Sequence, residues 1–266
     1  MNNSPKDFSP KAIFLDIDET LVIEGKGPFP EDIAAIEEAH RRGHKLFLST
    51  GRGLAHIPAV LRQAPWLDGI VAGAGAQVLI GDKTIYNKWV PREILPEICA
   101  LYLRLDKFCV FEGVSGVYGI NLPGFYLNNE AFFCIQREDD FCTRYKDAVI
   151  TKLTIGGRIS EAERTLLCAN FYLNTFPNYF EGILLGESKA KGMGIALEAL
   201  GIPRKNSIAI GDSKNDIDII RAAALGIAMG NACGELKALA GAITGDCGKG
   251  GVGQAISAFV LEKSKE

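Results

Sequence analysis

Short apolar runs and amphipathic stretches alternate along the first third of the chain. Residues 12–17, 44–51 and 68–75 are apolar runs of strand length, each followed by polar or glycine positions. Residues 30–43 and 53–64 lie between them and carry apolar side chains at helical spacing. Because parallel strands need a crossover connection, which is usually a helix, this order predicts a parallel sheet covered by helices on both faces.

The last third of the chain has the same alternation. The predicted helices are residues 191–202, 215–224, 235–241 and 251–263, and the predicted strands are residues 207–212, 225–230 and 242–245. We therefore expect the two ends of the chain to fold together into one α/β core, a Rossmann-like parallel sheet with helices on both faces.

The middle of the chain has a different character. Residues 82–90 and 148–157 alternate as strands do, and residues 113–124 are glycine-rich. Aromatic residues are dense in this part: Phe108, Phe111, Tyr118, Phe125, Tyr126, Phe132 and Phe133. The pattern predicts an inserted α+β domain. We expect a core over residues 1–82 and 187–266, and the insert over residues 83–186.

Composition and charge exclude several classes of protein. The chain has 266 residues, 47% hydrophobic residues and a formal net charge of −3, so no basic field indicates nucleic acid. It lacks an apolar run of the roughly 18 residues that span a bilayer, and its polar start is unlike a signal peptide. The seven cysteines are scattered, as is typical of free thiols in a reducing cytoplasm.

Acidic residues crowd the end of the first predicted strand. Asp16, Asp18 and Glu19 follow the buried run, where like charges repel and resist burial. Polar clusters also follow later strands, at 49–52 and at 211–216. Because the carboxyl ends of parallel strands meet at one edge of the sheet, these clusters are expected to form one pocket.

The residue types in these clusters suit phosphoryl chemistry. Asp16, Asp212 and Asp216 would form an oxygen-rich site that suits Mg²⁺. Thr50 can donate a hydrogen bond to a phosphoryl oxygen, Gly51 permits close backbone approach, and a lysine before the helix at 191–202 would add positive charge.

Four motifs carry a resemblance to a known family. They are DIDET at 16–20, STGR at 49–52, KAKG at 189–192 and GDSKND at 211–216. In this order and context they resemble the haloacid dehalogenase superfamily, and within it the Cof-type phosphatases with a class IIB cap. The resemblance implies that the inserted domain is the cap and that the active site binds Mg²⁺.

The resemblance also implies a role for each motif. Asp16 would be the nucleophile that forms an aspartyl phosphate, and Asp18 would be the general acid and base. Mg²⁺ would be held by Asp16, the backbone carbonyl of Asp18, and Asp212.

Other assignments leave alternatives. Asn215 and Asp216 would support the metal shell or the lysine, and Asn215 and Gly51 would lie against the substrate. Lys191 is preferred over Lys189 as the phosphoryl-binding lysine, because it directly precedes Gly192. Arg52 either binds substrate or pairs with a carboxylate.

The function that these expectations favour is a Mg²⁺-dependent phosphatase for a small phosphate ester in the cytoplasm, with a hexose phosphate as the first choice of substrate. The alternatives are a phosphatase for pyridoxal phosphate or flavin mononucleotide, a hexose phosphomutase, and a silent binding module. No membrane or nucleic-acid partner is expected, and the oligomeric state is left open. The cap is expected to hinge near residues 82 and 186, with Glu112 and Asn121 contacting the leaving group.

Overall fold

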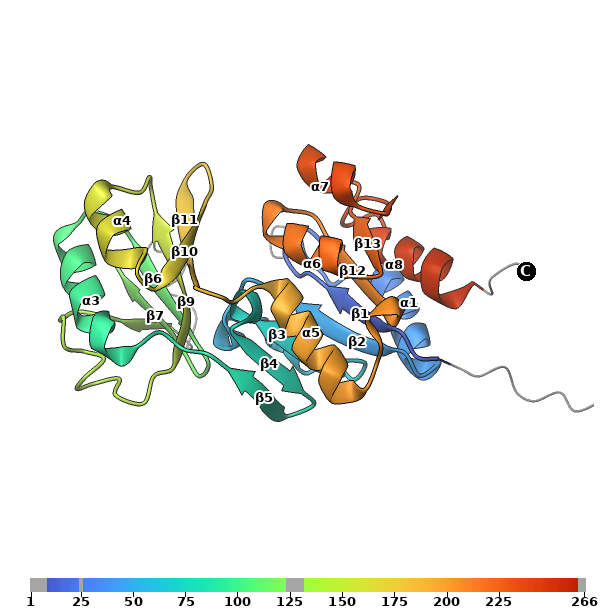
Figure 1. Ribbon diagram of the computed structural model, residues 1–266, viewed down its shortest axis with the longest axis horizontal. Helices are drawn as coiled ribbons and strands as arrows, with labels where there is room; N and C mark the ends of the chain where they lie inside the picture. Colours follow the sequence, from blue (N-terminus) through green and yellow to red (C-terminus); the bar gives the residue numbers. More distant parts are fainter. Residues whose placement is uncertain (1–8, 24–25, 123–131, 263–266) are drawn as a thin grey trace, which may run out of the picture.

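The computed structural model describes residues 9–23, 26–122 and 132–262. The chain forms two bodies, each built on its own sheet, and the chain crosses between them twice (Figure 1). Among the described residues, no helix combines the length and apolar character needed to cross a membrane. All seven cysteine thiols are free.

The larger body contains an eight-stranded sheet in the order β14-β13-β12-β1-β2-β3-β4-β5. Its strands are β1 (Ala12–Leu15), β2 (Lys45–Ser49), β3 (Gly69–Ala72), β4 (Gln77–Ile80), β5 (Lys83–Asn87), β12 (Ser207–Gly211), β13 (Leu225–Ala228) and β14 (Ala242–Ile243). The strands from β14 to β3 run parallel, and β4 and β5 add an antiparallel edge. This confirms the predicted Rossmann-like core.

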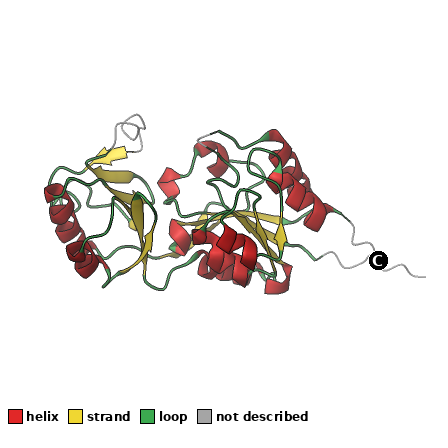
Figure 2. Cartoon of the chain, turned by 90° about the horizontal axis from the view of Figure 1, so that it is seen from above, coloured by secondary structure: helices red, strands yellow, loops and turns green. Residues whose placement is uncertain are grey.

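Helices cover both faces of the large sheet (Figures 1 and 2). They are α1 (Pro30–Arg41), α2 (Ala59–Arg62), α5 (Lys189–Leu200), α6 (Ile217–Ala222), α7 (Gly234–Leu239) and α8 (Gly251–Ile256). The pair α5 and α6 lies on one face, and the pair α1 and α8 lies on the other. The helix predicted at 53–64 is instead a 3₁₀ turn at 54–56 and the short α2, because Pro58 separates them.

The smaller body is a six-stranded sheet in the order β10-β11-β9-β6-β7-β8. Its strands are β6 (Cys109–Gly113), β7 (Val117–Ile120), β8 (Phe132–Cys134), β9 (Ile150–Gly156), β10 (Phe171–Thr175) and β11 (Tyr179–Leu184). All neighbours are antiparallel except β7 and β8. The helices α3 (Leu95–Arg104) and α4 (Glu161–Leu167) cover the face away from the larger body (Figures 1 and 2). The predicted α+β insert, hereafter the cap, is this body.

Each body has its own apolar core. The core of the larger body includes the stacked rings of Phe14 and Phe47, whose centroids are 4.9 Å apart. The core of the cap gathers around Phe111, Phe141 and Phe171. The predicted aromatic residues Phe125 and Tyr126 lie outside the described residues. The cap therefore buries its apolar face within itself rather than against the core.

The predicted domain boundaries fall near the two crossings. The strand β5, which the prediction assigned to the insert, pairs with β4 and so belongs to the large sheet. The first crossing therefore follows Asn87 rather than residue 82. The second predicted boundary, at residue 186, falls between β11 and α5 as expected. A role for these segments as hinges stays a prediction.

Candidate active site

The register of the parallel strands brings three predicted residues to one edge of the sheet. Leu15, the last residue of β1, lies between Leu48 of β2 and Ile210 of β12. The residues just beyond these strand ends therefore lie side by side, among them Asp16, Thr50 and Asp212. Asp16 and Thr50 are almost completely buried, so their polar groups need partners within the protein.

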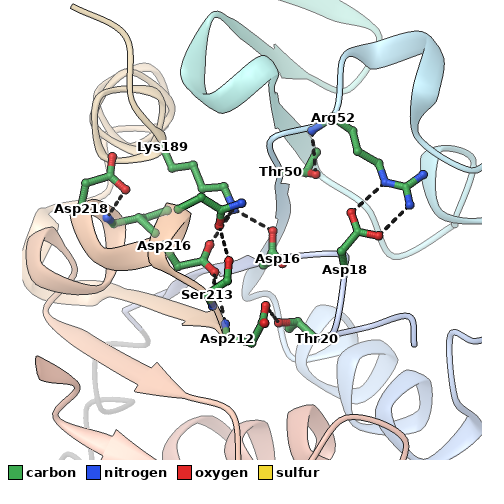
Figure 3. Close-up of polar contacts among 12 residues, drawn as sticks. Asp16, Asp18, Thr20, Thr50, Arg52, Lys189, Asp212, Ser213, Asp216 and Asp218 are labelled. Carbon is green, nitrogen blue, oxygen red and sulfur yellow. Dashed lines mark hydrogen bonds and ion pairs between the residues drawn. The ribbon is translucent and has the colours of Figure 1, made fainter. Parts of the chain in front are cut away.

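Lys189 provides the positive charge among the carboxylates (Figure 3). Its Nζ donates hydrogen bonds to Asp16 Oδ1 at 2.7 Å, to Asp216 Oδ1 at 2.6 Å and to Asn215 Oδ1 at 3.2 Å. Although burial alone would lower its pKa, the two aspartates hold the pKa of Lys189 well above its usual value. The lysine is therefore charged at neutral pH.

The preference for Lys191 over Lys189 was wrong. Lys191 lies outside the cluster and donates to Glu187 and to the hydroxyl of Tyr86, each at 2.8 Å. Its side chain is 40% exposed, whereas that of Lys189 is fully buried. Positions two apart on a helix point to nearly opposite sides, so only one of the two lysines can reach the strand ends.

Asp216 shapes the turn that carries Asp212. Its Oδ2 accepts hydrogen bonds from the backbone N–H groups of Asp212 at 3.2 Å and Ser213 at 3.1 Å, while its Oδ1 accepts from Lys189. Both oxygens therefore have donors within the protein. Asn215, predicted to contact substrate or support the lysine, lines the cavity and bonds to Lys189.

The carboxylates fit a divalent cation. Asp16, Asp212 and Asp216 each offer an oxygen within 4.8 Å of the others. Burial, then repulsion from Asp216, raises the pKa of Asp16 well above its usual range, and the same two causes raise that of Asp212 to about 7. Such a site favours a cation that offsets the repulsion, and hard carboxylate oxygens are the ligands that Mg²⁺ prefers. Since Asp216 is already occupied by donors, Asp16 and Asp212 are the better candidates to hold it.

Asp18 and Arg52 form a bidentate ion pair (Figure 3). Arg52 Nε and Nη2 donate to the two carboxylate oxygens of Asp18 at 2.8 and 2.6 Å. Burial tends to raise the pKa of Asp18, but these hydrogen bonds outweigh it and hold the pKa below its usual value. Of the two readings of Arg52, the structure shows the pairing with a carboxylate. The predicted metal contact of Asp18, through its backbone carbonyl, stays a prediction.

Thr50 and Gly51 form the floor beside Asp16. Thr50 Oγ1 accepts a hydrogen bond from the backbone N–H of Arg52 at 3.1 Å, so its hydroxyl hydrogen can be donated elsewhere. A Cβ on Gly51 would lie 3.3 Å from Nζ of Lys152, a residue of the cap. The glycine therefore leaves room where core and cap approach each other at the site.

A cavity of about 580 Å³ lies between core and cap, above these residues. The cap contributes to its wall the residues Phe108, Glu112, Lys152, Thr154, Phe176, Tyr179 and Glu181. Of these, only Glu112 was predicted from the sequence to contact the leaving group, and Phe108 was noted only as one of the aromatic residues of the insert. The period of two along β9 could have found Lys152 and Thr154, since alternate residues of a strand share a face.

The other cap residue predicted to contact the leaving group was misplaced. Asn121 donates to the backbone carbonyls of Leu105 at 3.0 Å and Lys107 at 3.2 Å, and it is not part of the cavity wall. Its φ of 49° lies in the left-handed region, which asparagine tolerates. It therefore holds the end of β7. The end of the predicted loop, Pro123 and Gly124, lies outside the described residues.

Glu112 joins the cap to the core. Its Oε2 accepts a hydrogen bond from the backbone N–H of Gly53 at 2.7 Å and lies 3.2 Å from Nδ1 of His56. Its Oε1 accepts from Thr154 within the cap at 2.8 Å. This buried carboxylate therefore bridges the two bodies beside the cavity.

Comparisons with known proteins agree with this geometry. The 5-amino-6-(5-phospho-D-ribitylamino)uracil phosphatase YcsE of Bacillus subtilis (strain 168) is 27% identical over 263 residues, which cover 98% of this chain and 100% of that protein. A phosphoglycolate phosphatase of Methanothermobacter thermautotrophicus is 25% identical, over 94% and 99% of the two chains. The solved structure of the haloacid dehalogenase subclass IIB sugar phosphatase BT4131 has a TM-score of 0.80 and 27% identity, over 95% of this chain and 100% of that chain.

A match to a protein family also covers most of the chain. The family described as haloacid dehalogenase-like hydrolase matches residues 13–256, which include all four motifs and the cap. The resemblance stated from the motifs is thereby confirmed, and the chain belongs to the haloacid dehalogenase-like hydrolases.

Proposed function

We propose that this chain is a Mg²⁺-dependent phosphatase for a small phosphorylated metabolite. The observation that carries the proposal is the buried contact of Lys189 with Asp16, beside Thr50 and at the base of a cavity. An ammonium and a hydroxyl donor around a carboxylate suit an anionic phosphoryl group that is attacked by that carboxylate.

The reaction is proposed in two steps. In the first, Asp16 attacks phosphorus, the bond from phosphorus to the leaving oxygen breaks, and that oxygen takes a proton from Asp18. For this step Asp18 must be protonated and released from its pair with Arg52, which holds it ionised. In the second, Asp18 takes a proton from a water molecule whose oxygen attacks phosphorus, and this frees inorganic phosphate and Asp16. Lys189 and Thr50 hold the phosphoryl oxygens throughout, and Asp216 and Asn215 hold Lys189. A bound Mg²⁺ would supply positive charge that lets the anionic nucleophile approach an anionic ester.

The leaving group is proposed to be a sugar. The named relatives include a sugar phosphatase and a phosphatase whose substrate name contains a phosphorylated ribityl chain. The cavity also has room for a group of this size and offers both charged and aromatic side chains.

The test is a screen of phosphate esters with the purified chain, with Mg²⁺ and with EDTA, by release of inorganic phosphate. Phosphate release should require Mg²⁺, and Asp16→Asn should lower kcat by at least about 10³-fold while leaving the melting temperature nearly unchanged. An Asp16→Asn variant with substantial turnover would contradict the role of Asp16. Isomerised product without free phosphate would instead identify a mutase.

A further inference from the structure

The wall of the cavity that faces Asp16 carries a buried ion cluster. Lys152, from β9, is paired with Glu181 of β11 and lies 3.7 Å from Glu112 of β6. All three side chains are at least nine-tenths buried. Ionised groups are costly to bury, and this cluster contributes to the cavity wall rather than to either apolar core.

The hydrogen bonds within this cluster are unevenly distributed. Both oxygens of Glu112 accept hydrogen bonds, from Gly53 and from Thr154. Glu181 differs, since Lys152 donates to its Oε1 while its buried Oε2 has no hydrogen-bond partner among the described residues. An unpaired buried carboxylate oxygen is costly, which points to a donor that arrives with a ligand.

Lys152 and Glu181 lie close to the phosphoryl-binding floor. A Cβ on Gly51 would be 3.3 Å from Lys152 Nζ and 4.0 Å from Glu181 Oε1. A phosphate ester seated against Asp16 and Thr50 would therefore present the first atoms of its leaving group to this pair. The stacked rings of Phe176 and Tyr179, 4.5 Å between centroids, line the same cavity and can pack against carbon atoms.

The cluster has an excess of negative charge. Lys152 keeps its charge because, against the effect of burial, Glu181 and Glu112 raise its pKa. Against the same effect, Lys152 and His56 lower the pKa of Glu112 well below its usual range. One ammonium thus faces two carboxylates. A leaving group with its own carboxylate would be repelled here, whereas a hydroxyl can both donate to Glu181 and accept from Lys152.

We propose that Glu181 and Lys152 are the specificity-determining pair for the leaving group, and that they select neutral, hydroxyl-bearing leaving groups against those that carry a carboxylate. This inference rests on the proposed phosphatase function. It names the chemical class of the ester and the two residues that distinguish it.

The test compares two esters that differ in one group near the phosphate. Glycerol 3-phosphate carries a hydroxymethyl group where 3-phosphoglycerate carries a carboxylate, in both esters at the third carbon from the ester oxygen. A third ester, phenyl phosphate, has no hydroxyl group on its leaving group. The wild-type chain with Mg²⁺ should show a kcat/KM for glycerol 3-phosphate at least about 10-fold above that for 3-phosphoglycerate. A hydroxyl bonded to a charged partner is worth about 10- to 100-fold in binding.

Substitution of Glu181 should remove this preference. Glu181→Ala should lower kcat/KM for glycerol 3-phosphate by about 10- to 100-fold. Glu181→Gln removes only the charge and should raise kcat/KM for 3-phosphoglycerate severalfold. Both variants should change kcat/KM for phenyl phosphate by less than about threefold, since that ester leaves Glu181 untouched.

Glu163→Gln is the matched control. It makes the same charge change at a buried glutamate of the cap that pairs with a lysine, but it lies outside the cavity wall. It should leave the ratio of kcat/KM between glycerol 3-phosphate and 3-phosphoglycerate unchanged, and melting curves should show that every variant is folded.

The inference and the proposed function fail in different ways. Equal losses for all three esters in Glu181→Ala would overturn the inference, as would a wild-type chain that shows no preference or hydrolyses only phenyl phosphate. A folded wild-type chain that releases no phosphate from any ester with Mg²⁺ would instead overturn the proposed function.

Discussion

The ammonium of Lys189 balances the charge of the strand ends. It contacts Asp16 and Asp216 in a buried site to which Asp212 also contributes a carboxylate. Removal of one partner from a buried ion pair leaves an uncompensated charge, which is among the costlier changes in a protein. Lys189 and Lys191 both lie at the start of α5, so mutation of each in turn gives a matched comparison.

Lys189→Met should lower kcat/KM for any hydrolysed ester by at least about 10²-fold, because the phosphoryl group loses its positive partner. Lys191→Met removes the same charge two residues away, where the side chain pairs with Glu187, and should stay within about threefold of wild type. Steady-state kinetics at saturating Mg²⁺ would measure both. If Lys191→Met proved the more damaging variant, the placement of Lys189 at the phosphoryl group would be contradicted.

The sequence held a signal that favoured Lys189. The buried residues of α5 are Lys189, Gly192, Met193, Ala196 and Leu197. These follow the i, i+3, i+4, i+7, i+8 spacing of one helical face, so Lys189 continues the apolar stripe while Lys191 does not. The positions of the side chains at the strand ends were also predictable, because the order and length of the strands determine which residues lie at that edge of the sheet. The cap residues Lys152 and Glu181 were not, since their pairing across β9 and β11 depends on a register that no local pattern shows.

At the scale of elements, α5 is held in place by the turn after β3. A Cβ on Gly75 would lie 1.9 Å from the carbonyl oxygen of Ser188, the N-cap residue of α5, and a Cβ on Gly192 would lie 2.4 Å from Val71. Gly75 also has a φ of 99°, which only glycine adopts readily. The absence of side chains here lets the helix approach closely enough for Lys189 to reach Asp16.

Gly75→Ala should therefore displace the start of α5. We expect a loss of about 2 kcal/mol or more in the free energy of unfolding, from the steric overlap and the strained φ together. We also expect a fall in kcat/KM, because Lys189 moves with the helix. Gly201→Ala is the control, since its φ of 65° is also positive but its Cβ would point into open space at the far end of α5. It should destabilise the protein without a matching loss of activity.

The hydrogen bonds at the N-terminus of α4 stabilise the fold by an amount that depends on pH. Ser160 and Glu163 form a capping box, and Lys107 Nζ donates to Glu163 Oε2 at 2.7 Å. Burial tends to raise the pKa of Glu163, but the hydrogen bonds from Lys107 and Ser160 outweigh it and lower the pKa. A carboxylate with a lowered folded pKa stabilises fully above its unfolded pKa of roughly 4.3 and loses this contribution as the pH falls through the folded value.

Glu163→Gln should therefore destabilise the protein by about 1–3 kcal/mol at pH 7, and the difference from wild type should shrink below about pH 4. Urea unfolding of both chains at pH 7 and pH 3.5 measures the two differences. A difference that is the same at both pH values would show that the charge of Glu163 contributes nothing to stability.

The positions of the strands along the chain were easier to predict than which strands pair with each other. The alternation at 82–90 indicated a strand, but not that it would pair with β4 in the large sheet. The strands β4 and β5 form one hairpin. The apolar run of β4 directly follows the glycine-rich stretch after β3, so the sequence gives no separate signal for this strand. Whether a strand joins one sheet or another depends on contacts that only the folded chain provides.

At the scale of the whole molecule, Glu112 connects the cap to the core beside the site. Its bonds to Gly53 and His56 cross from one body to the other. Charges in the cavity act strongly only when water is excluded, so the closed arrangement matters for every ester.

Glu112→Ala should weaken closure and lower kcat/KM for sugar esters and phenyl phosphate alike, by about 10-fold or more. The radius of gyration from small-angle X-ray scattering should rise as the cap opens. This uniform loss distinguishes Glu112 from Glu181, whose substitution is expected to change the ranking of esters. An unchanged radius together with a changed ranking would assign Glu112 to substrate recognition instead.

The place of the cap within the chain governs the order in which the protein is made. The central strand β1 pairs on one side with β12, so that Ala12 lies opposite Ser207. On the ribosome, the whole cap emerges before β12 does. A nascent chain that has just completed the cap therefore has only strands β1 to β5 of the large sheet. The open edge of β1 is then a surface on which other chains can add strands. Lys189 and Asp212, which lie beside Asp16, are also made only after the cap, so activity can begin only after β12 has been synthesised.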